Sequence, residues 1–156
     1  MAIRLTKKEY ENLSDKRTSS LEKAKTKGTK NGKFYRKNEE HENQVALFQL
    51  LEANKHKNIA FKLAFATPNG GFRDWKTAKS LKDEGVKAGV PDVCIPGPSR
   101  CYHGLFIEMK AGKNKATAEQ KFYLERLTEL GYKTAVCYSV DEAKQVIEEY
   151  FEISLG

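Results

Sequence analysis

Three charged residues interrupt two short apolar runs of the sequence, at places where a plain hydrophobic core would hold Val or Ile. Asp92 is the second residue of the run PDVCI, and Glu108 and Lys110 lie among the last three residues of the run LFIEMK. Successive residues of a strand point to opposite faces, so we expect Glu108 and Lys110 to project side by side, away from Ile107. An antiparallel pairing of the two runs would bring Asp92 beside Glu108.

This set of side chains suits metal-dependent hydrolysis. Two carboxylates and a backbone carbonyl form a pocket of hard oxygen ligands, which fits Mg²⁺ that keeps several of its waters. Lys110 can then orient or deprotonate the attacking water, or offset charge in a phosphorane-like transition state. The alternative is a salt-bridged sheet edge, in which Asp92 is a turn residue and Glu108 and Lys110 are solvated.

The sequence around the two runs predicts an α/β fold with a mixed central sheet flanked by helices. Apolar periodicity, turn residues and capping residues define its elements. In chain order they are helix 39–54, strand 58–67, turn 68–71, helix 74–85, the neighbouring strands PDVCI and YHGLFIEMK, helix 117–131, strand 132–138 and a final helix after Ser139.

Capping residues mark the ends of two of these helices. Asn38 is the expected N-cap of the first helix, with acids in its first turn. Thr117 and Gln120 form a T-x-x-Q capping box at the start of helix 117–131, and Gly131 stops that helix. Helical spacing directs inward Val45, Leu47, Phe48 and Leu51 of the first helix, and Phe122, Leu127 and Leu130 of the second.

The net charge of +7 is concentrated at the start of the chain of 156 residues. Residues 1–38 hold 12 Lys and Arg against 4 Asp and Glu, a balance of +8, whereas residues 39–156 hold 16 against 17, a balance of −1. We therefore expect a basic, flexible N-terminal arm (1–37) followed by one domain (38–156). Such an arm is typical of a protein that binds nucleic acid. The alternative is a solvated tail that only improves solubility.

Other classes of protein find no support in the composition. No apolar run approaches the roughly 20 residues of a membrane span, and no signal peptide is visible, so we expect a cytoplasmic protein without a membrane partner. Cys94, Cys101 and Cys137 are widely spaced and form no C-x-x-C pair, which disfavours disulfides and zinc ligation. The three histidines make no HExxH or HxxxH spacing.

Residues 40–147 resemble the VRR-NUC family, the virus-type replication-repair nucleases of the PD-(D/E)XK nuclease superfamily. Each fragment is weak alone, but they occur in order and at sensible spacings over essentially everything after the basic arm. The matching stretches are EHENQVALF, ATPNGGFR, LKDEGVKAGVPDV, GLFIEMKAG and ATAEQKFYLERLTELGYKTAV.

The resemblance implies a restriction-endonuclease-like core and a metal-dependent nuclease acting on DNA, often branched or nicked, of phage or repair type. Asp92 and Glu108 would be the metal ligands, assisted by the main-chain carbonyl of Met109, and Lys110 would be the catalytic lysine. Mg²⁺ is the implied cofactor, with Mn²⁺ able to substitute. A phage-encoded protein of this type would act in the host cytoplasm.

The resemblance also assigns roles on the two flanking helices. Glu40, in EHENQ, looks like the helix acid that holds the metal through a water or binds a second metal; Glu42 is its rival. Gln44 lies one helical turn from Glu40 and shares its face, so we count it among DNA-contacting residues. Gln120 matches a glutamine that faces the active site in the family, and it can cap its helix at the same time.

Further basic and aromatic residues are candidates for the DNA path. Arg73 and Lys87, with the turn at residues 69–71, are expected to flank the phosphates, although solvated loop charges explain them equally well. Trp75 and Tyr102 could stack on an unpaired base, with buried packing preferred for Trp75. The expected arm contacts include Lys30, Lys33, Arg36 and Lys37.

The function predicted from the sequence is therefore that of a DNA endonuclease, either structure-specific for a junction, flap or nick, or a nickase. The first alternative is a nuclease fold that only holds DNA or a replication protein. A second is an inhibitor or scaffold that works through protein contacts, with the arm binding an acidic partner. Symmetric cutting of two strands would call for a two-fold homodimer.

Overall fold

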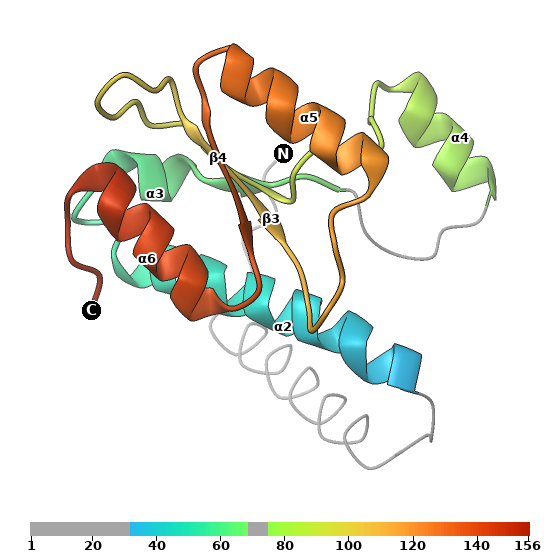
Figure 1. The fold of residues 1–156 in the computed structure, drawn as a ribbon, viewed down its shortest axis with the longest axis horizontal. Helices are drawn as coiled ribbons and strands as arrows, with labels where there is room; N and C mark the ends of the chain where they lie inside the picture. Colours follow the sequence, from blue (N-terminus) through green and yellow to red (C-terminus); the bar gives the residue numbers. More distant parts are fainter. Residues whose placement is uncertain (1–31, 69–74) are drawn as a thin grey trace, which may run out of the picture. The chain divides into compact units, whose positions relative to one another are not determined.

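A four-stranded mixed sheet lies between layers of helices in the computed structural model, which describes residues 32–68 and 75–156 (Figure 1). The strand order is β1-β2-β3-β4; the first two neighbouring pairs are antiparallel and the β3–β4 pair is parallel. The predicted α/β class with a mixed sheet is confirmed. The strands are β1 (Phe65–Ala66), β2 (Val93–Ile95), β3 (Leu105–Met109) and β4 (Lys133–Cys137).

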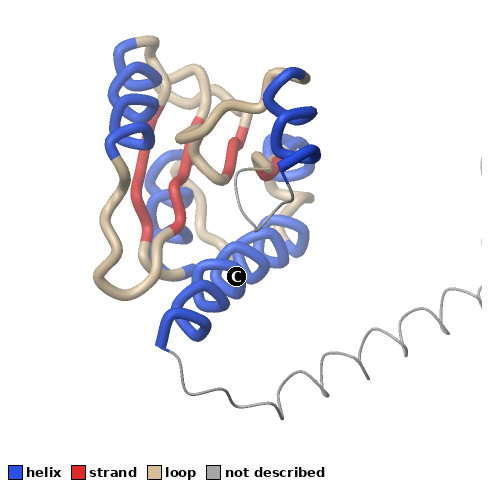
Figure 2. Tube along the Cα trace, turned by 90° about the vertical axis from the view of Figure 1, so that its right-hand side faces the viewer, coloured by secondary structure: helices blue, strands red, loops and turns tan. Residues whose placement is uncertain are grey.

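The helices cover both faces of this sheet. Figure 1 shows α2 and α6 on one face and α5 on the other, and Figure 2 shows the strands enclosed by helices after a turn of 90°. No helix in the described part of the chain is long and apolar enough to cross a membrane. The helices are α2 (Gly32–Ala53), α3 (Ile59–Leu63), α4 (Trp75–Asp83), α5 (Ala118–Glu129) and α6 (Val140–Phe151).

The core lies between the sheet and the pair α2 and α6. Leu47 and Leu51 of α2 and Ile147 of α6 are buried in one cluster with Leu105 and Ile107 of β3. At about 25 cal/mol per Å² of apolar surface, each such side chain contributes roughly 1.5–3 kcal/mol by leaving water. The apolar side chains that alternate along β3 thus point to this face. Glu108 points to the opposite face of β3.

Two element boundaries differ from the prediction. The first helix begins at Gly32, so Asn38 lies inside α2 and is not its N-cap. The predicted strand 58–67 is wrong for its first half, which forms α3 before the two-residue strand β1. The cause is local: the Asn58 side chain accepts a hydrogen bond from Ala60 N and so caps a helix.

Three apolar side chains predicted to face inward are exposed. Phe122 is 58% exposed, Leu130 66% and Val45 41%, whereas Leu124 is the buried residue of α5. The guanidinium carbon of Arg126 lies 5.8 Å from the centroid of the Phe122 ring, so the exposed ring makes a cation–π contact at the surface.

Gly89 provides a test of how the segment before β2 is fixed against α5. It has a φ of +84°, and a Cβ added there would lie 2.7 Å from the backbone carbon of Glu119. We expect Gly89→Ala to lower the free energy of unfolding by roughly 2–4 kcal/mol, from left-handed strain plus overpacking. Gly85 has a φ of +98° with open space around it, so Gly85→Ala should cost only about 1 kcal/mol. Equal costs by chemical denaturation would contradict the close packing.

Candidate active site

Asp92 and Glu108 lie opposite each other across the antiparallel pair of β2 and β3. Val93 is paired with Ile107, and continuing this register by one residue places Asp92 opposite Glu108. The Asp92 carboxylate is held by Met109, whose backbone N–H donates to Oδ2 at 2.9 Å. The predicted convergence of the two acids follows from this register, since a slip of one residue would move Glu108 to the other face.

Glu108 is fully buried, and one of its oxygens has no hydrogen-bond donor among the described residues. Its Oε1 accepts from Lys110 Nζ at 2.5 Å and from Gln120 Nε2. Its Oε2 is buried without such a partner. Lys110 is itself only 7% exposed and also donates to the Met109 carbonyl at 3.1 Å. A salt-bridged but solvated sheet edge is therefore excluded.

Burial sets the electrostatics of the two acids. It raises the pKa of Glu108 to about 7, against the opposing effect of the hydrogen bond from Lys110. The pKa of Asp92 is also raised by burial, and the hydrogen bond from Met109 opposes that shift. The two carboxyl groups interact directly, and the neighbouring Asp92 charge further raises the pKa of Glu108.

These features fit a hard divalent cation. A bound cation would provide the missing partner for the orphaned Oε2 and offset the repulsion between the two acids. The described residues contain no group of three or more His, Cys, Asp or Glu placed to hold a metal. Mg²⁺ is usually bound through only one or two carboxylates with waters filling its other positions, so the pair Asp92 and Glu108 meets its requirement.

Glu40 of α2 reaches the segment that follows Lys110. Its Oε1 accepts from the backbone N–H of Ala111 at 3.2 Å, and its charge contributes to raising the pKa of Asp92. Glu42 is exposed to solvent. Of the two rival helix acids, Glu40 is thus the one that lies beside the acid pair.

Gln120 makes the contacts that both of its predicted roles require, as a cap of α5 and as a residue that faces the candidate active site. Its Oε1 accepts from the backbone N–H of Thr117 at 2.8 Å, and Thr117 Oγ1 accepts from Gln120 N at 3.3 Å, which completes the capping box. Its Nε2 donates to Glu108 Oε1. The start of α5 is therefore fixed to the buried acid through one side chain.

Comparison with known proteins shows which family contains this chain. The family model for the VRR-NUC domain matches residues 35–141, more than half of the chain. The chain belongs to the VRR-NUC family. It is also similar to a solved structure described as a VRR_NUC domain protein, with 30% identity and a TM-score of 0.60, covering 74% of this chain and 90% of that one. No curated protein matches the chain.

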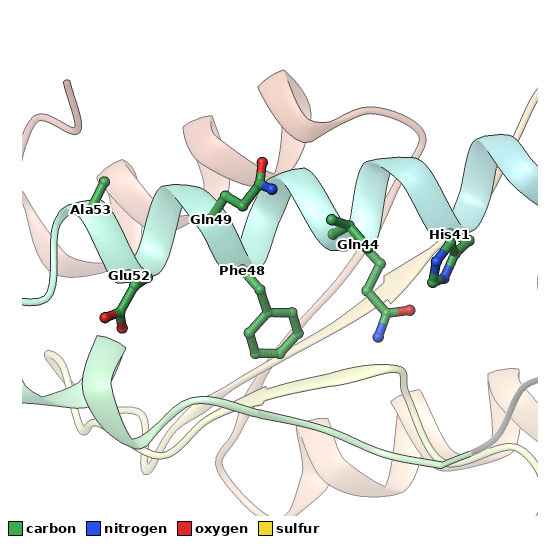
Figure 3. Close-up of a pocket in the computed structure, with 7 residues that line it drawn as sticks. His41, Gln44, Phe48, Gln49, Glu52 and Ala53 are labelled. Carbon is green, nitrogen blue, oxygen red and sulfur yellow. The ribbon is translucent and has the colours of Figure 1, made fainter. Parts of the chain in front are cut away.

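The other described candidates for DNA contact in this VRR-NUC domain lie on separate elements. Gln44 is half-buried and, with Phe48, lines an open cavity of about 600 Å³ along α2 (Figure 3). Lys87 is exposed between α4 and β2. Tyr102 lies in the loop that precedes β3, and its ring packs against Tyr150 of α6. The ring is therefore at the opposite end of β3 from Lys110.

Several predicted contacts fall outside the described residues or side chains. The turn at residues 69–71 and Arg73 belong to the segment 69–74, and the side chain of Trp75 is not described. Of the arm residues, Lys30 lies outside the described residues, and the side chains of Lys33, Arg36 and Lys37 are not described. Their roles in the VRR-NUC protein stay predictions.

The sequence reading missed one residue that supports the site. Thr67 follows β1, and its backbone N–H donates to the Asp92 carbonyl at 2.8 Å while its hydroxyl donates to the Pro91 carbonyl at 2.6 Å. These bonds continue the sheet and hold the backbone that presents the Asp92 carboxylate. The available signal was a polar residue at the end of β1, directly before Pro68.

A metal held by Asp92 and Glu108 of this VRR-NUC domain should bind in a pH-dependent manner. Cation binding requires ionised carboxylates, and Glu108, with a pKa of about 7, keeps its proton below that pH. We expect the affinity for Mn²⁺ to fall about tenfold per pH unit below pH 7 and to be level above it, since one proton must leave. Titration calorimetry between pH 5.5 and 8.5 measures this. A constant affinity across that range would show that Glu108 does not bind the ion.

Proposed function

We propose that this protein is a Mg²⁺-dependent DNA endonuclease, specific for a DNA structure such as a junction, flap or nick, or a nickase. Membership of the VRR-NUC family supports a nuclease. The observation that carries the proposal is the buried Glu108 Oε2, which lacks a partner among the described residues beside Asp92, with Lys110 bound to the same carboxylate. A charge arrangement that is costly without a ligand indicates a site kept for function.

Asp92 and Glu108 would hold the cation, with the Met109 carbonyl next to them. When bound, a divalent cation supplies Lewis-acid polarisation of the scissile phosphate and lowers the pKa of a water. The protein itself contributes preorganisation: Met109 N–H fixes Asp92, and Gln120 fixes Glu108. The catalysis therefore takes place on groups whose orientation is set before DNA binds.

Lys110 would act on the reacting phosphate. Its ammonium is held against Glu108 and the Met109 carbonyl, in a nearly buried position where its charge is weakly screened. From there it orients the attacking water and stabilises negative charge that develops on the phosphate in the transition state. Glu40 keeps the backbone after Lys110 in place through its bond to Ala111.

A cleavage assay tests the proposal. The full chain is incubated with linear, nicked, flap and four-way DNA, with Mg²⁺, with Mn²⁺ and with EDTA. We expect at least one of these DNAs to be cut with Mg²⁺ and none with EDTA. If no DNA is cut with either metal, the enzyme proposal fails; salt-dependent binding without cutting would instead favour a DNA-holding module.

A further inference from the structure

The segment between β3 and α5 exposes two lysines directly after the candidate active site. Gly112, Lys113, Asn114 and Lys115 are all exposed, and the first acid that follows them is Glu119. Neither lysine forms an ion pair with any described residue, whereas other exposed cations, such as Arg100 and Arg126, are neutralised by neighbouring acids. Their charge is therefore available to a polyanion.

This segment is tied to the site at both of its ends. At its start, Ala111 N–H donates to Glu40 Oε1 at 3.2 Å, on the helix that lies beside the turn (Figure 1). At its end, Thr117 N–H donates to Gln120 Oε1, and the same glutamine donates to Glu108. The lysines therefore have a defined placement relative to the acid pair.

A turn inside the segment brings the lysines close to Lys110. Asn114 N–H donates to the Ala111 carbonyl at 3.1 Å, which closes a tight turn with Lys113 at its tip. The chain cannot span more than about 3.6 Å per residue. The Cα atom of Lys113 therefore lies within about 11 Å of the Cα atom of Lys110, and that of Lys115 within about 18 Å. Phosphates repeat about every 3.4 Å of helix axis along one DNA strand.

We propose that Lys113 and Lys115 bind backbone phosphates a few nucleotides from the scissile bond. The proposal rests on the nuclease function proposed above. The two side chains would position the strand for Lys110 without touching the reacting atoms, so they are positioning residues. Because phosphates are the same in every sequence, these contacts carry no sequence preference.

The test compares the Lys113→Ala/Lys115→Ala variant with wild-type protein for binding to a labelled duplex and a labelled four-way junction. Fluorescence anisotropy in EDTA, which prevents cutting, gives the affinity between about 50 and 200 mM salt. Loss of two phosphate contacts should make the slope of log K against log salt less steep by about 1.8, and weaken binding about 10- to 30-fold at about 150 mM. Arginine at both positions should restore the slope.

The matched control is Lys62→Ala/Lys133→Ala, which removes two exposed lysines on α3 and at the start of β4, the opposite end of the sheet from Lys110. This control should keep the wild-type slope. An unchanged slope in the Lys113→Ala/Lys115→Ala variant overturns the proposal, even if the wild-type protein cuts DNA. A reduced slope in a protein that cuts no DNA supports the contacts and rejects only the enzyme.

In a cutting protein, the kinetics give a second readout. Contacts made equally to substrate and transition state affect KM and leave kcat unchanged. We therefore expect the Lys113→Ala/Lys115→Ala variant to show a KM raised about tenfold or more with kcat within twofold of wild type. A lowered kcat at unchanged KM would contradict phosphate contacts that are made equally to substrate and transition state.

Discussion

Replacing Lys110 with methionine should lower the rate of DNA cleavage by at least about 10²- to 10³-fold, the usual effect of removing one preorganised charge from a transition state. Methionine keeps most of the volume of the side chain, which is 7% exposed. With Lys110 present the pKa of Glu108 is about 7, and loss of the lysine that lowers it favours the neutral, protonated acid, so the variant does not leave an obligatory buried charge. Single-turnover cleavage with saturating protein measures the chemical step.

DNA binding separates this expectation from a general loss of structure. The Lys110→Met variant should bind DNA in EDTA within about threefold of wild type, because a nearly buried lysine offers little charge to the backbone. The exposed Lys121 on α5 provides a matched Lys→Met control, which should keep its cleavage rate. Cleavage by the Lys110→Met variant at the wild-type rate would remove Lys110 from the mechanism.

Replacing Glu108 with glutamine should remove most of the stabilisation of the fold by divalent metal. A ligand at ten times its Kd stabilises the folded state by about 1.4 kcal/mol. For a chain of this size, that corresponds to a rise in Tm of about 3–6 °C in the wild-type protein. The variant loses the negative charge of one of the two carboxylates, so we expect less than a third of that rise, measured by thermal unfolding with and without Mg²⁺.

The same substitution should not destabilise the metal-free protein. Its amide oxygen still accepts from Lys110 and Gln120, and the neighbouring Asp92 remains as an anion that attracts the Lys110 ammonium. Glu125→Gln, at an exposed position of α5, controls for the loss of one acid. An equal metal-induced rise in Tm for the Glu108→Gln variant and wild type would show that the ion binds elsewhere.

These two expectations also bear on the alternative of a DNA-holding module. Such a module would require only surface charge, and it would gain stability from an apolar residue at position 108. Glu108 is instead fully buried and paired with Lys110, an arrangement whose desolvation cost is rarely recovered by the ion pair alone. A reaction that uses the charges, as in the proposed function, would account for this cost.

The geometry of the acids could be predicted from the sequence because it depends on the two-residue period of a strand. Leu105, Ile107 and Met109 had to share the core face, which assigned Glu108 and Lys110 to the other face. The capping box of Thr117 and Gln120 was equally local, and it placed a glutamine at the start of α5 where it reaches Glu108.

Features that depend on tertiary contacts were not predicted. Helical spacing alone did not show that α5 buries Leu124 and leaves Phe122 and Leu130 exposed, because several faces of that helix carry apolar residues. The bonds of Thr67 to the Asp92 segment and of Glu40 to Ala111 join residues far apart in the chain. Spacing within one sequence gives no information on such pairs.

Anomalous diffraction from crystals grown with Mn²⁺ tests most directly whether the two buried acids share a metal ion. We predict one strong anomalous peak between the carboxylates of Asp92 and Glu108, with an oxygen of each at coordinating distance. A peak bound by other residues, or no peak beside Glu108 Oε2, would contradict the assignment of this carboxylate pair as the catalytic metal site.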